Sequence, residues 1–295
     1  MHTRTCAHTR WFGRLDGFRE TVLGSGPVQN TLAKHMKVLK LIGHLLIISL
    51  LTIITQLGGL IWLIALVISL QKKWKKRLVF PLIYLTFNLL LIPPIASFFG
   101  REKLPWIDNN LKPINWFYPL AFRNYVNPQL KVELKNSANA LSLSSISITY
   151  LDANFPFIDG FPLLPHLSHN DGKKIDIAFM YLDKNSESTE NKPSSSGYGA
   201  FVNSKENYTS NFCINKGYWQ YDFTKYLTFG TNNNLKFDES KTAQLINELL
   251  SISSAEKIFI EPHLKKSLGL GSNSNLRFQG CAAVRHDDHI HFQIK

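Results

Sequence analysis

Arg285-His286-Asp287-Asp288-His289-Ile290-His291-Phe292 places three imidazoles and two carboxylates within six consecutive positions near the end of the chain. Successive side chains of a β-strand point to opposite faces, so His289 and His291 share one face, while Ile290, Phe292 and Ile294 share the other. The segment therefore predicts a strand with one apolar face for packing and one polar face on which two imidazoles converge, as at a metal site.

A second segment, Ser168 to Asp176, supplies a histidine and a carboxylate in the arrangement H-x-x-x-x-x-x-D. His169 lies in a polar, glycine-containing loop, and Asp176 lies in the apolar run Ile175 to Leu182, which predicts a largely buried strand. A carboxylate inside such a run is costly unless a cation meets it. Together with His289 and His291 these two residues make four candidate ligands for one Zn²⁺ per chain. His169, Asp176 and His291 as ligands would leave a fourth tetrahedral position for water, as in catalytic zinc sites.

The two segments together resemble a known family. S-H-x-x-G-x-x-x-D at Ser168 to Asp176 and H-D-D-H-x-H at His286 to His291 are similar to the paired motifs of the penicillin-insensitive murein endopeptidase type. That type belongs to a zinc peptidase superfamily with lysostaphin-like, D-alanyl-D-alanine-cleaving and hedgehog-like domains. The strand Lys257 to Pro262 and the basic pair that follows it extend the resemblance, which covers about the last half of the chain.

The resemblance implies a role for each residue of the motifs. His169, Asp176 and His291 match the zinc ligands, His289 matches the base or transition-state stabiliser, and His286 matches a second active-site imidazole. Five further residues near the motifs are candidates for orienting the ligands or binding the substrate: His166, His263, Asp287, Asp288 and Arg285.

The expected fold class is α+β, with a small, mainly antiparallel sheet that carries the zinc site and is flanked by helices. We place this zinc peptidase-like domain at residues 141–295, behind a juxtamembrane connector at 101–140. The alternating segment Ser145 to Leu151 predicts its first strand. Asp238 predicts the N-cap of a helix that continues to Leu250 and turns Leu245, Ile246, Leu249 and Leu250 to the core.

Two apolar runs precede this domain and predict a transmembrane helical hairpin at residues 37–100, with spans at about 45–70 and 78–99. The loop Gln71 to Arg77 between them is cationic and is expected to stay in the cytoplasm. A two-span, multi-pass anchor in the cytoplasmic or inner membrane then places both the N-terminus and the catalytic domain on the outer, periplasmic or extracytoplasmic side. Residues 1–36 form an N-terminal tail, and Lys37 and Lys40 support the hypothesis that the native chain begins at Met36.

The net charge and the composition indicate which partners the protein can have. The net charge of +12 suits a protein that works beside anionic lipid headgroups and wall polymers. A nuclease is disfavoured, and no nucleic acid partner is expected, because no tract of alternating arginine and aromatic residues supports one. Cys213 and Cys281 are candidates for a disulfide in an exported domain, although spacing alone does not decide their pairing.

The leading functional hypothesis is a membrane-anchored zinc metallopeptidase that hydrolyses amide bonds in peptidoglycan stem peptides or their cross-links. One alternative is a D-Ala-D-Ala carboxypeptidase or dipeptidase, and another is a non-catalytic, zinc-stabilised module that binds the cell wall. The presence of both His286 and His289 favours an enzyme over a binding module, because a module that only binds does not need a base. The sequence leaves the scissile bond and the oligomeric state open.

Overall fold

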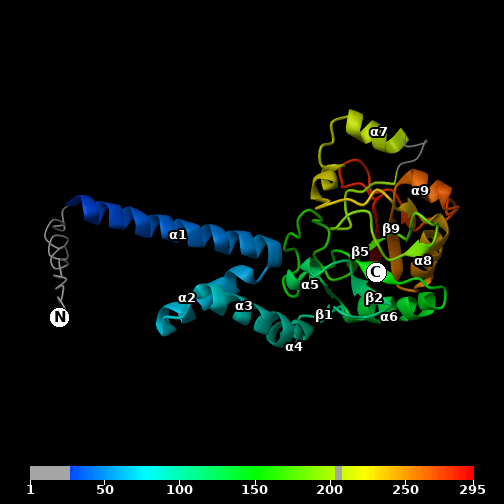
Figure 1. The fold of residues 1–295 in the computed structure, drawn as a ribbon. Coiled ribbons are helices and arrows are strands. Elements are labelled where there is room, and N and C mark those ends of the chain that lie inside the picture. Colours follow the sequence, from blue (N-terminus) through cyan, green and yellow to red (C-terminus); the bar gives the residue numbers. More distant parts are fainter. Residues whose placement is uncertain (1–26, 203–207) are drawn as a thin grey trace, which may run out of the picture. The chain divides into compact units, whose positions relative to one another are not determined.

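The computed structural model describes residues 27–202 and 208–295 (Figure 1). Contacts divide the chain into a unit that ends at Ile47 and a unit that begins at Ile48, and each is described by itself. Residues 1–26 of the expected N-terminal tail lie outside the described residues, whereas the tail's last ten residues belong to the helix α1 (Pro27–Thr55).

Two helical segments have the length and composition of membrane spans. They are Thr31–Thr55, of 25 residues, and Lys76–Phe98, of 23 residues. Their apolar side chains are largely exposed, with Leu39 and Leu46 of α1 at 70% and 66%. Exposed aliphatic side chains all along a helix are stable only where lipid or another apolar surface covers them. The two segments are thus candidates for membrane association.

The apolar run at 45–70, expected as one span, is interrupted. α1 ends at Thr55, Gln56 adopts a positive φ of 64°, and a separate helix α2 (Gly58–Lys72) follows. A Cβ on Gly59 would lie 2.6 Å from the carbonyl oxygen of Ile48, so only glycine allows α2 to pack this closely on the last turns of α1. A shorter apolar helix therefore lies between the two candidate spans.

The second candidate span contains three segments: α3 (Lys76–Thr86), the π-helix η1 (Phe87–Leu91) and α4 (Ile92–Phe98). Pro93 and Pro94 in the first turn of α4 lack backbone N–H groups. Their missing donors leave carbonyl groups of the preceding turn without helical partners, and a wider π turn is one way for a helix to adapt. The span is therefore helical throughout but locally widened.

The main sheet is mixed, and the expectation of a small, mainly antiparallel sheet is wrong. Within the described residues it has six strands in the order β10-β9-β11-β5-β4-β2, in which the β10/β9 and β2/β4 pairs are parallel. A helix connects each parallel pair, α9 (Pro262–Ser267) in one case and α6 (Pro128–Ser142) in the other, and parallel strands need such a crossover. The strands are β2 (Leu111–Pro113), β4 (Ile148–Tyr150), β5 (Lys174–Ala178), β9 (Ala255–Phe259), β10 (Leu276–Arg277) and β11 (His289–Ile294).

The core lies on the aliphatic face of this sheet. Ile290 pairs with Ile177 and Phe292 with Ile175, and these side chains join one hydrophobic cluster with buried residues of α6 and of α8 (Glu239–Ser251). The predicted cap of α8 is confirmed, because the Asp238 carboxylate accepts a hydrogen bond from the Lys241 N–H at 2.9 Å. The segment 101–140, expected as a connector, contributes β2 and α6 to this sheet and core.

Smaller elements complete the second unit. The buried run expected at Ile175 to Leu182 forms β5 and then β6, and two short sheets have the orders β1-β3 and β7-β6-β8. These remaining elements are β1 (Glu102–Lys103), α5 (Phe117–Leu120), β3 (Tyr125–Val126), β6 (Tyr181–Leu182), β7 (Ser188–Thr189), α7 (Tyr208–Asn215), the 3-10 helix η2 (Phe223–Leu227) and β8 (Lys236–Phe237).

Candidate metal centre

The two sequence motifs meet on adjacent antiparallel strands. β5 pairs with β11 so that Asp176 lies directly opposite His291, in the register that also pairs Ile177 with Ile290. Side chains alternate along each strand, so Asp176, His289 and His291 occupy the face opposite the aliphatic core. The same alternation that buries the isoleucines therefore assembles the polar cluster.

The three expected ligand atoms form a compact triangle. His169 Nε2 lies 3.1 Å from Asp176 Oδ1 and 3.0 Å from His291 Nδ1, and the last two atoms are 2.9 Å apart. A tetrahedral zinc ion with bonds of about 2.0–2.1 Å needs ligand atoms about 3.3 Å apart. The triangle is close to that size.

The backbone fixes the tautomer of His169. Its Nδ1 lies 2.7 Å from the carbonyl oxygen of Ala153, which can only accept, so Nδ1 carries the proton. In the neutral ring Nε2 then has no proton and is an acceptor. It faces the Asp176 carboxylate, which is also an acceptor. Two acceptors held this close require a cation or a proton between them, and a histidine oriented by a backbone carbonyl is typical of a metal ligand.

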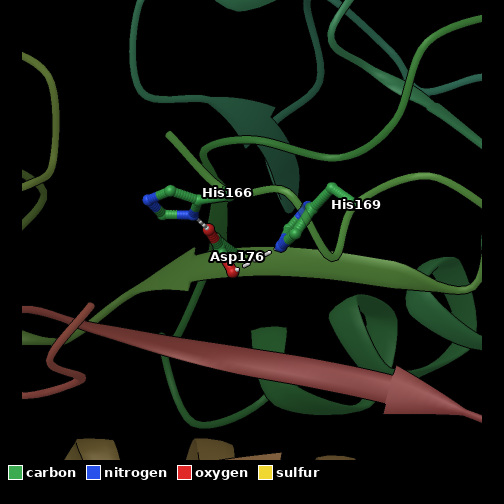
Figure 2. A group of neighbouring side chains, drawn as sticks. All are labelled: His166, His169 and Asp176. Carbon is green, nitrogen blue, oxygen red and sulfur yellow. Dashed lines mark hydrogen bonds and ion pairs between the residues drawn. The ribbon is translucent and has the colours of Figure 1, made fainter. Parts of the chain in front are cut away.

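A further histidine binds the same carboxylate. His166 Nδ1 donates to Asp176 Oδ2, and ligand atoms of His166, His169 and Asp176 all lie within 4.8 Å of one another (Figure 2). All three side chains are buried. His166 Nε2 is also buried and has no hydrogen-bond partner among residues 27–202 and 208–295. This group can hold a metal ion, although its carboxylate is already engaged in ion pairs with histidines.

Asp176 has a second layer of support that the sequence analysis missed. Tyr198 donates its hydroxyl to Asp176 Oδ2 at 2.8 Å and lies 3.3 Å from Asp152 Oδ2. Asp152 in turn forms a bidentate pair with Arg123, at 2.5 and 2.8 Å. All these side chains are buried, so a charged and hydrogen-bonded chain runs from Arg123 to the metal centre.

The surroundings prepare Asp176 and His291 to receive a cation. Burial opposes ionisation of Asp176, but His169, His166 and His289 outweigh it and hold the pKa of this carboxyl well below its ordinary value. Burial lowers the pKa of His291 to about 4, against the smaller opposing effect of Asp176. At neutral pH the carboxyl is ionised and the His291 imidazole is neutral, which are the forms that bind a metal.

His289 differs from His291 in its charge. Burial alone would lower its pKa, but Asp288 and Asp176 raise it to about 9, and its Nδ1 donates to Asp288 Oδ1 at 2.5 Å. Its Nε2 lies 3.6 Å from Asp176 Oδ2 and has no hydrogen-bond partner in the part of the chain that the structure describes. His289 thus presents a cationic N–H to the centre.

His286 also lies at the cluster. Its ring centroid is 4.9 Å from that of His289 and 5.7 Å from that of His291. Burial and these two imidazoles hold its pKa well below the ordinary value for histidine, so the ring is neutral. The backbone N–H of His286 donates to Glu261 Oε1 at 3.2 Å, which ties the segment before β11 to the end of β9.

Three of the other candidates contact groups away from the triangle. Arg285 forms a bidentate ion pair with Asp287 and stacks 3.9 Å above the ring of Phe201. His263 Nε2 donates to the carbonyl oxygen of Val202 at 3.1 Å and lies 3.9 Å from Asp287. The remaining candidates, His166 and Asp288, bind Asp176 and His289 as described above.

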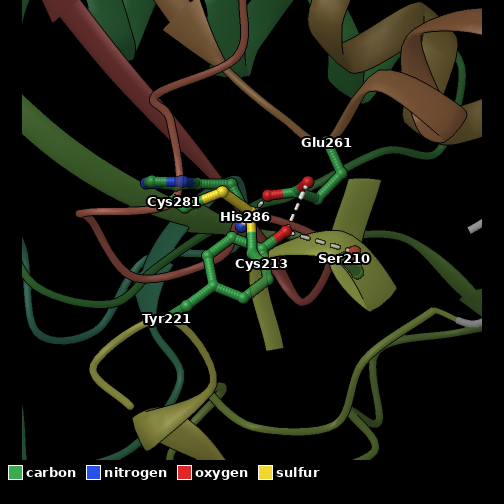
Figure 3. The surroundings of a disulfide bond; sticks show 6 residues. All are labelled: Ser210, Cys213, Tyr221, Glu261, Cys281 and His286. Carbon is green, nitrogen blue, oxygen red and sulfur yellow. Dashed lines mark hydrogen bonds between the residues drawn. A yellow bond between two sulfur atoms is a disulfide. The ribbon is translucent and has the colours of Figure 1, made fainter. Parts of the chain in front are cut away.

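A disulfide joins α7 to the segment that leads into β11. Cys213 and Cys281 are bonded, with Cα atoms 5.2 Å apart (Figure 3). Close by, Tyr221 donates its hydroxyl to Glu261 Oε2 at 2.7 Å, and the other oxygen of Glu261 accepts from His286. The pairing left open by the sequence is therefore formed, and it braces the approach to the histidine segment.

Comparisons with known proteins add no further identification. No model of a known protein family matches the chain, and no curated protein is significantly similar to it.

Proposed function

We propose that the chain is a membrane-anchored zinc metallopeptidase that hydrolyses amide bonds in peptidoglycan stem peptides or their cross-links. The observation that carries this proposal is the triangle of His169 Nε2, Asp176 Oδ1 and His291 Nδ1, with sides of 2.9–3.1 Å. The donor set of two imidazoles and one carboxylate, with further histidines beside it, matches the expectation from the resemblance to murein endopeptidases.

The donor atoms fit zinc by type and by number, since imidazole nitrogen and carboxylate oxygen are its common ligands alongside thiolate. When bound, zinc supplies a Lewis acid and lowers the pKa of a water molecule to about 7. His169, Asp176 and His291 would hold it, and Tyr198 would keep the carboxylate in place through its 2.8 Å hydrogen bond.

The remaining imidazoles have complementary roles. The cationic N–H of His289 is placed to stabilise negative charge that develops on a substrate carbonyl oxygen and to give a proton to the departing amine. The ring of His286 is neutral, so it is the one of the pair with a nitrogen lone pair free to accept a proton. The two rings lie 4.9 Å apart, so one acid and one base are available in the same site.

The disulfide supports an extracytoplasmic location, because disulfides persist in oxidising compartments. The cationic loop between α2 and α3 would stay in the cytoplasm. This loop is too charged to remain in hydrocarbon, so we take α2, a shorter apolar helix of 15 residues, as a third crossing between the two candidate spans. Three crossings place Lys37 and Lys40 on the same side as the loop and the zinc domain on the other. The two-span expectation placed the N-terminus outside.

The test is zinc content and murein digestion by the full chain, with His169→Ala beside it. We expect one zinc per chain and soluble muropeptides from the unchanged protein. Removal of a ligand should weaken zinc binding by more than the 10–100-fold typical of outer hydrogen-bond partners. His263→Ala is the matched control, since His263 is a buried histidine of the same domain that contacts Val202 and Asp287 instead.

Mass spectrometry of the products separates the peptidase types. Cleaved cross-links support an endopeptidase, whereas release of free D-alanine alone indicates a carboxypeptidase. Zinc binding without any hydrolysis would favour the wall-binding module. Absence of zinc from the unchanged protein would contradict the metal site.

A further inference from the structure

The loop that carries two of the site histidines also carries exposed apolar side chains. Residues 151–173 connect β4 to β5 and contain His166 and His169. In the same loop Ile158, Leu164 and Leu167 are 61%, 51% and 57% exposed. Three exposed aliphatic side chains beside buried site residues are unusual for a loop that faces only water.

This loop is attached to the ends of both candidate membrane spans. The backbone N–H of Phe157 donates to Gln56 Oε1 at 3.2 Å, one residue beyond the first span, which ends at Thr55. The ring of Phe157 packs on Phe99, one residue beyond the second span, with centroids 5.1 Å apart. The loop therefore lies where both spans leave the membrane.

The second span contacts the domain on one side and exposes apolar side chains on the other. Asn88 Nδ2 donates to the carbonyl oxygens of Pro119 and Leu120 at 3.0 Å, and Ile92 is buried in a cluster with Phe122 and Phe155. The side chains of the same segment that point away are exposed, among them Leu90 at 68%, Ile95 at 44% and Phe98 at 89%. These contacts come from Asn88 and Ile92 in the second half of the span, the half nearer the domain, so they bring the domain against the bilayer.

We propose that Ile158, Leu164 and Leu167 insert into the lipid surface and hold the metal centre at the membrane, so that the site takes peptides anchored in that membrane. The occupant of this apolar surface is the lipid surface itself, because the loop is continuous with the ends of the two spans. The substrate part of the proposal rests on the proposed function.

The distance between lipid and metal centre is short. Leu167 is one residue and Leu164 two residues from His166, so at most about 7 Å of extended chain separates each of them from a histidine bound to Asp176. The carbonyl oxygen of Leu164 also accepts from Arg123 at 2.7 Å, and Arg123 is paired with Asp152 beside the centre. A peptide held at the headgroups is thus within reach of the site, whereas murein strands far from the membrane are not.

Lipid contact is tested with an environment-sensitive fluorophore on single cysteines in the full chain. Cys6→Ser is the background, Cys213 and Cys281 keep their disulfide, and the labels are placed by Leu164→Cys and Leu167→Cys. Leu143→Cys is the matched control, since Leu143 is a leucine with 91% exposure at the end of α6. The protein is reconstituted in phosphatidylethanolamine and phosphatidylglycerol vesicles with and without brominated acyl chains.

We expect blue-shifted emission that brominated lipid quenches at residues 164 and 167, and unquenched, water-like emission at 143. Water-like emission at all three positions would overturn the inference. Blue-shifted emission at 164 and 167 that brominated lipid does not quench would also overturn the inference. In that case a second copy or another protein, and not lipid, would cover the loop.

The substrate part is tested with one stem peptide in two forms, free and attached to a palmitoyl chain. The unchanged protein should cleave the anchored form faster, and the double variant Ile158→Glu, Leu167→Glu should lose that preference while it still cleaves the free peptide. Leu143→Glu should keep the preference. Equal rates on the two forms by the unchanged protein contradict the present inference, whereas failure to cleave either form contradicts the proposed function and leaves the fluorescence to decide the lipid contact.

Discussion

The two oxygens of Asp176 contact four polar side chains, and at one of these contacts, with His169 Nε2, two acceptor atoms face each other. One oxygen faces His169 and His291, and the other accepts from His166 and Tyr198. Tyr198→Phe removes one of these donors without changing the shape of the side chain. We expect a loss of zinc affinity of about tenfold or more and a loss of unfolding free energy of about 1 kcal/mol.

The measurement is a competition titration with a zinc chelator, together with urea unfolding of the metal-free protein. Tyr118→Phe is the control, because Tyr118 is equally buried and donates to the carbonyl oxygen of Ser196 rather than to Asp176. We expect Tyr118→Phe to lose a similar amount of unfolding free energy and to keep its zinc affinity unchanged. Equal zinc affinity in both variants would contradict the role of Tyr198.

The raised pKa of His289 predicts that the stability of the metal-free protein depends on pH. Its pKa is raised to about 9 in the folded chain, against about 6.5 for an unperturbed histidine. The folded state therefore holds more protons than the unfolded state between these values, so the contribution of His289 is complete below about pH 6.5 and is lost as the pH rises through about 9. Thermal unfolding with a chelator present should show Tm falling across this window.

His289→Gln should flatten that fall, because an amide does not titrate. The quantity to compare is the difference in Tm between the unchanged protein and His289→Gln at each pH, because contributions from other titrating groups cancel in that difference. A variant with an unchanged slope would show that His289 is not the titrating group.

The residues in the two motifs were predictable because their spacing along a strand and a loop is local information. His169, Asp176, His289 and His291 are brought together on one face, as alternation along β11 requires. Tyr198, Asp152 and Arg123 were not predictable. Tyr198 lies in a polar segment whose composition is typical of a mobile loop, yet it is only 3% exposed, and nothing in its local pattern indicates a partner 22 residues away.

At the scale of elements, the disulfide between α7 and the segment before β11 closes a sequence separation of 68 residues. Cys213→Ser or Cys281→Ser should lower the unfolding free energy by about 2–4 kcal/mol, since the crosslink restricts the unfolded chain. Chemical unfolding with and without a reductant measures this. The double variant should equal each single variant, and a reductant should leave all three unchanged; a reductant effect in the variants would contradict the assignment.

Among the elements, α8 was predictable from its cap and its buried leucines, and the strand β11 from its alternation. The sheet was not. Its parallel outer pairs arise because α6 and α9 act as crossovers, and whether a short strand such as β2 joins one edge depends on contacts between distant segments. Gln56 likewise interrupts an apolar run that hydropathy alone describes as continuous.

At the scale of the whole molecule, the proposed arrangement of three membrane crossings predicts the side of each segment. Lys37→Cys and Lys75→Cys should be protected from a membrane-impermeant thiol reagent in intact cells, and Leu143→Cys should react. All variants carry Cys6→Ser, so that the introduced cysteine is the free thiol and Cys213 and Cys281 stay in their disulfide. Reaction at Lys37→Cys with protection at Lys75→Cys would restore the two-span arrangement and contradict the proposed one.

The amino-acid sequence on its own specified the α+β class, the apolar helices and the residues that form the polar cluster, because periodicity and composition act over a few neighbouring positions. Folding in three dimensions set the mixed order of the sheet, the support of Asp176 by Tyr198 and the attachment of the loop of His166 and His169 to the ends of both spans. These features depend on contacts between residues that are tens of positions apart. Such contacts form only when the whole chain packs, so local sequence patterns do not indicate them.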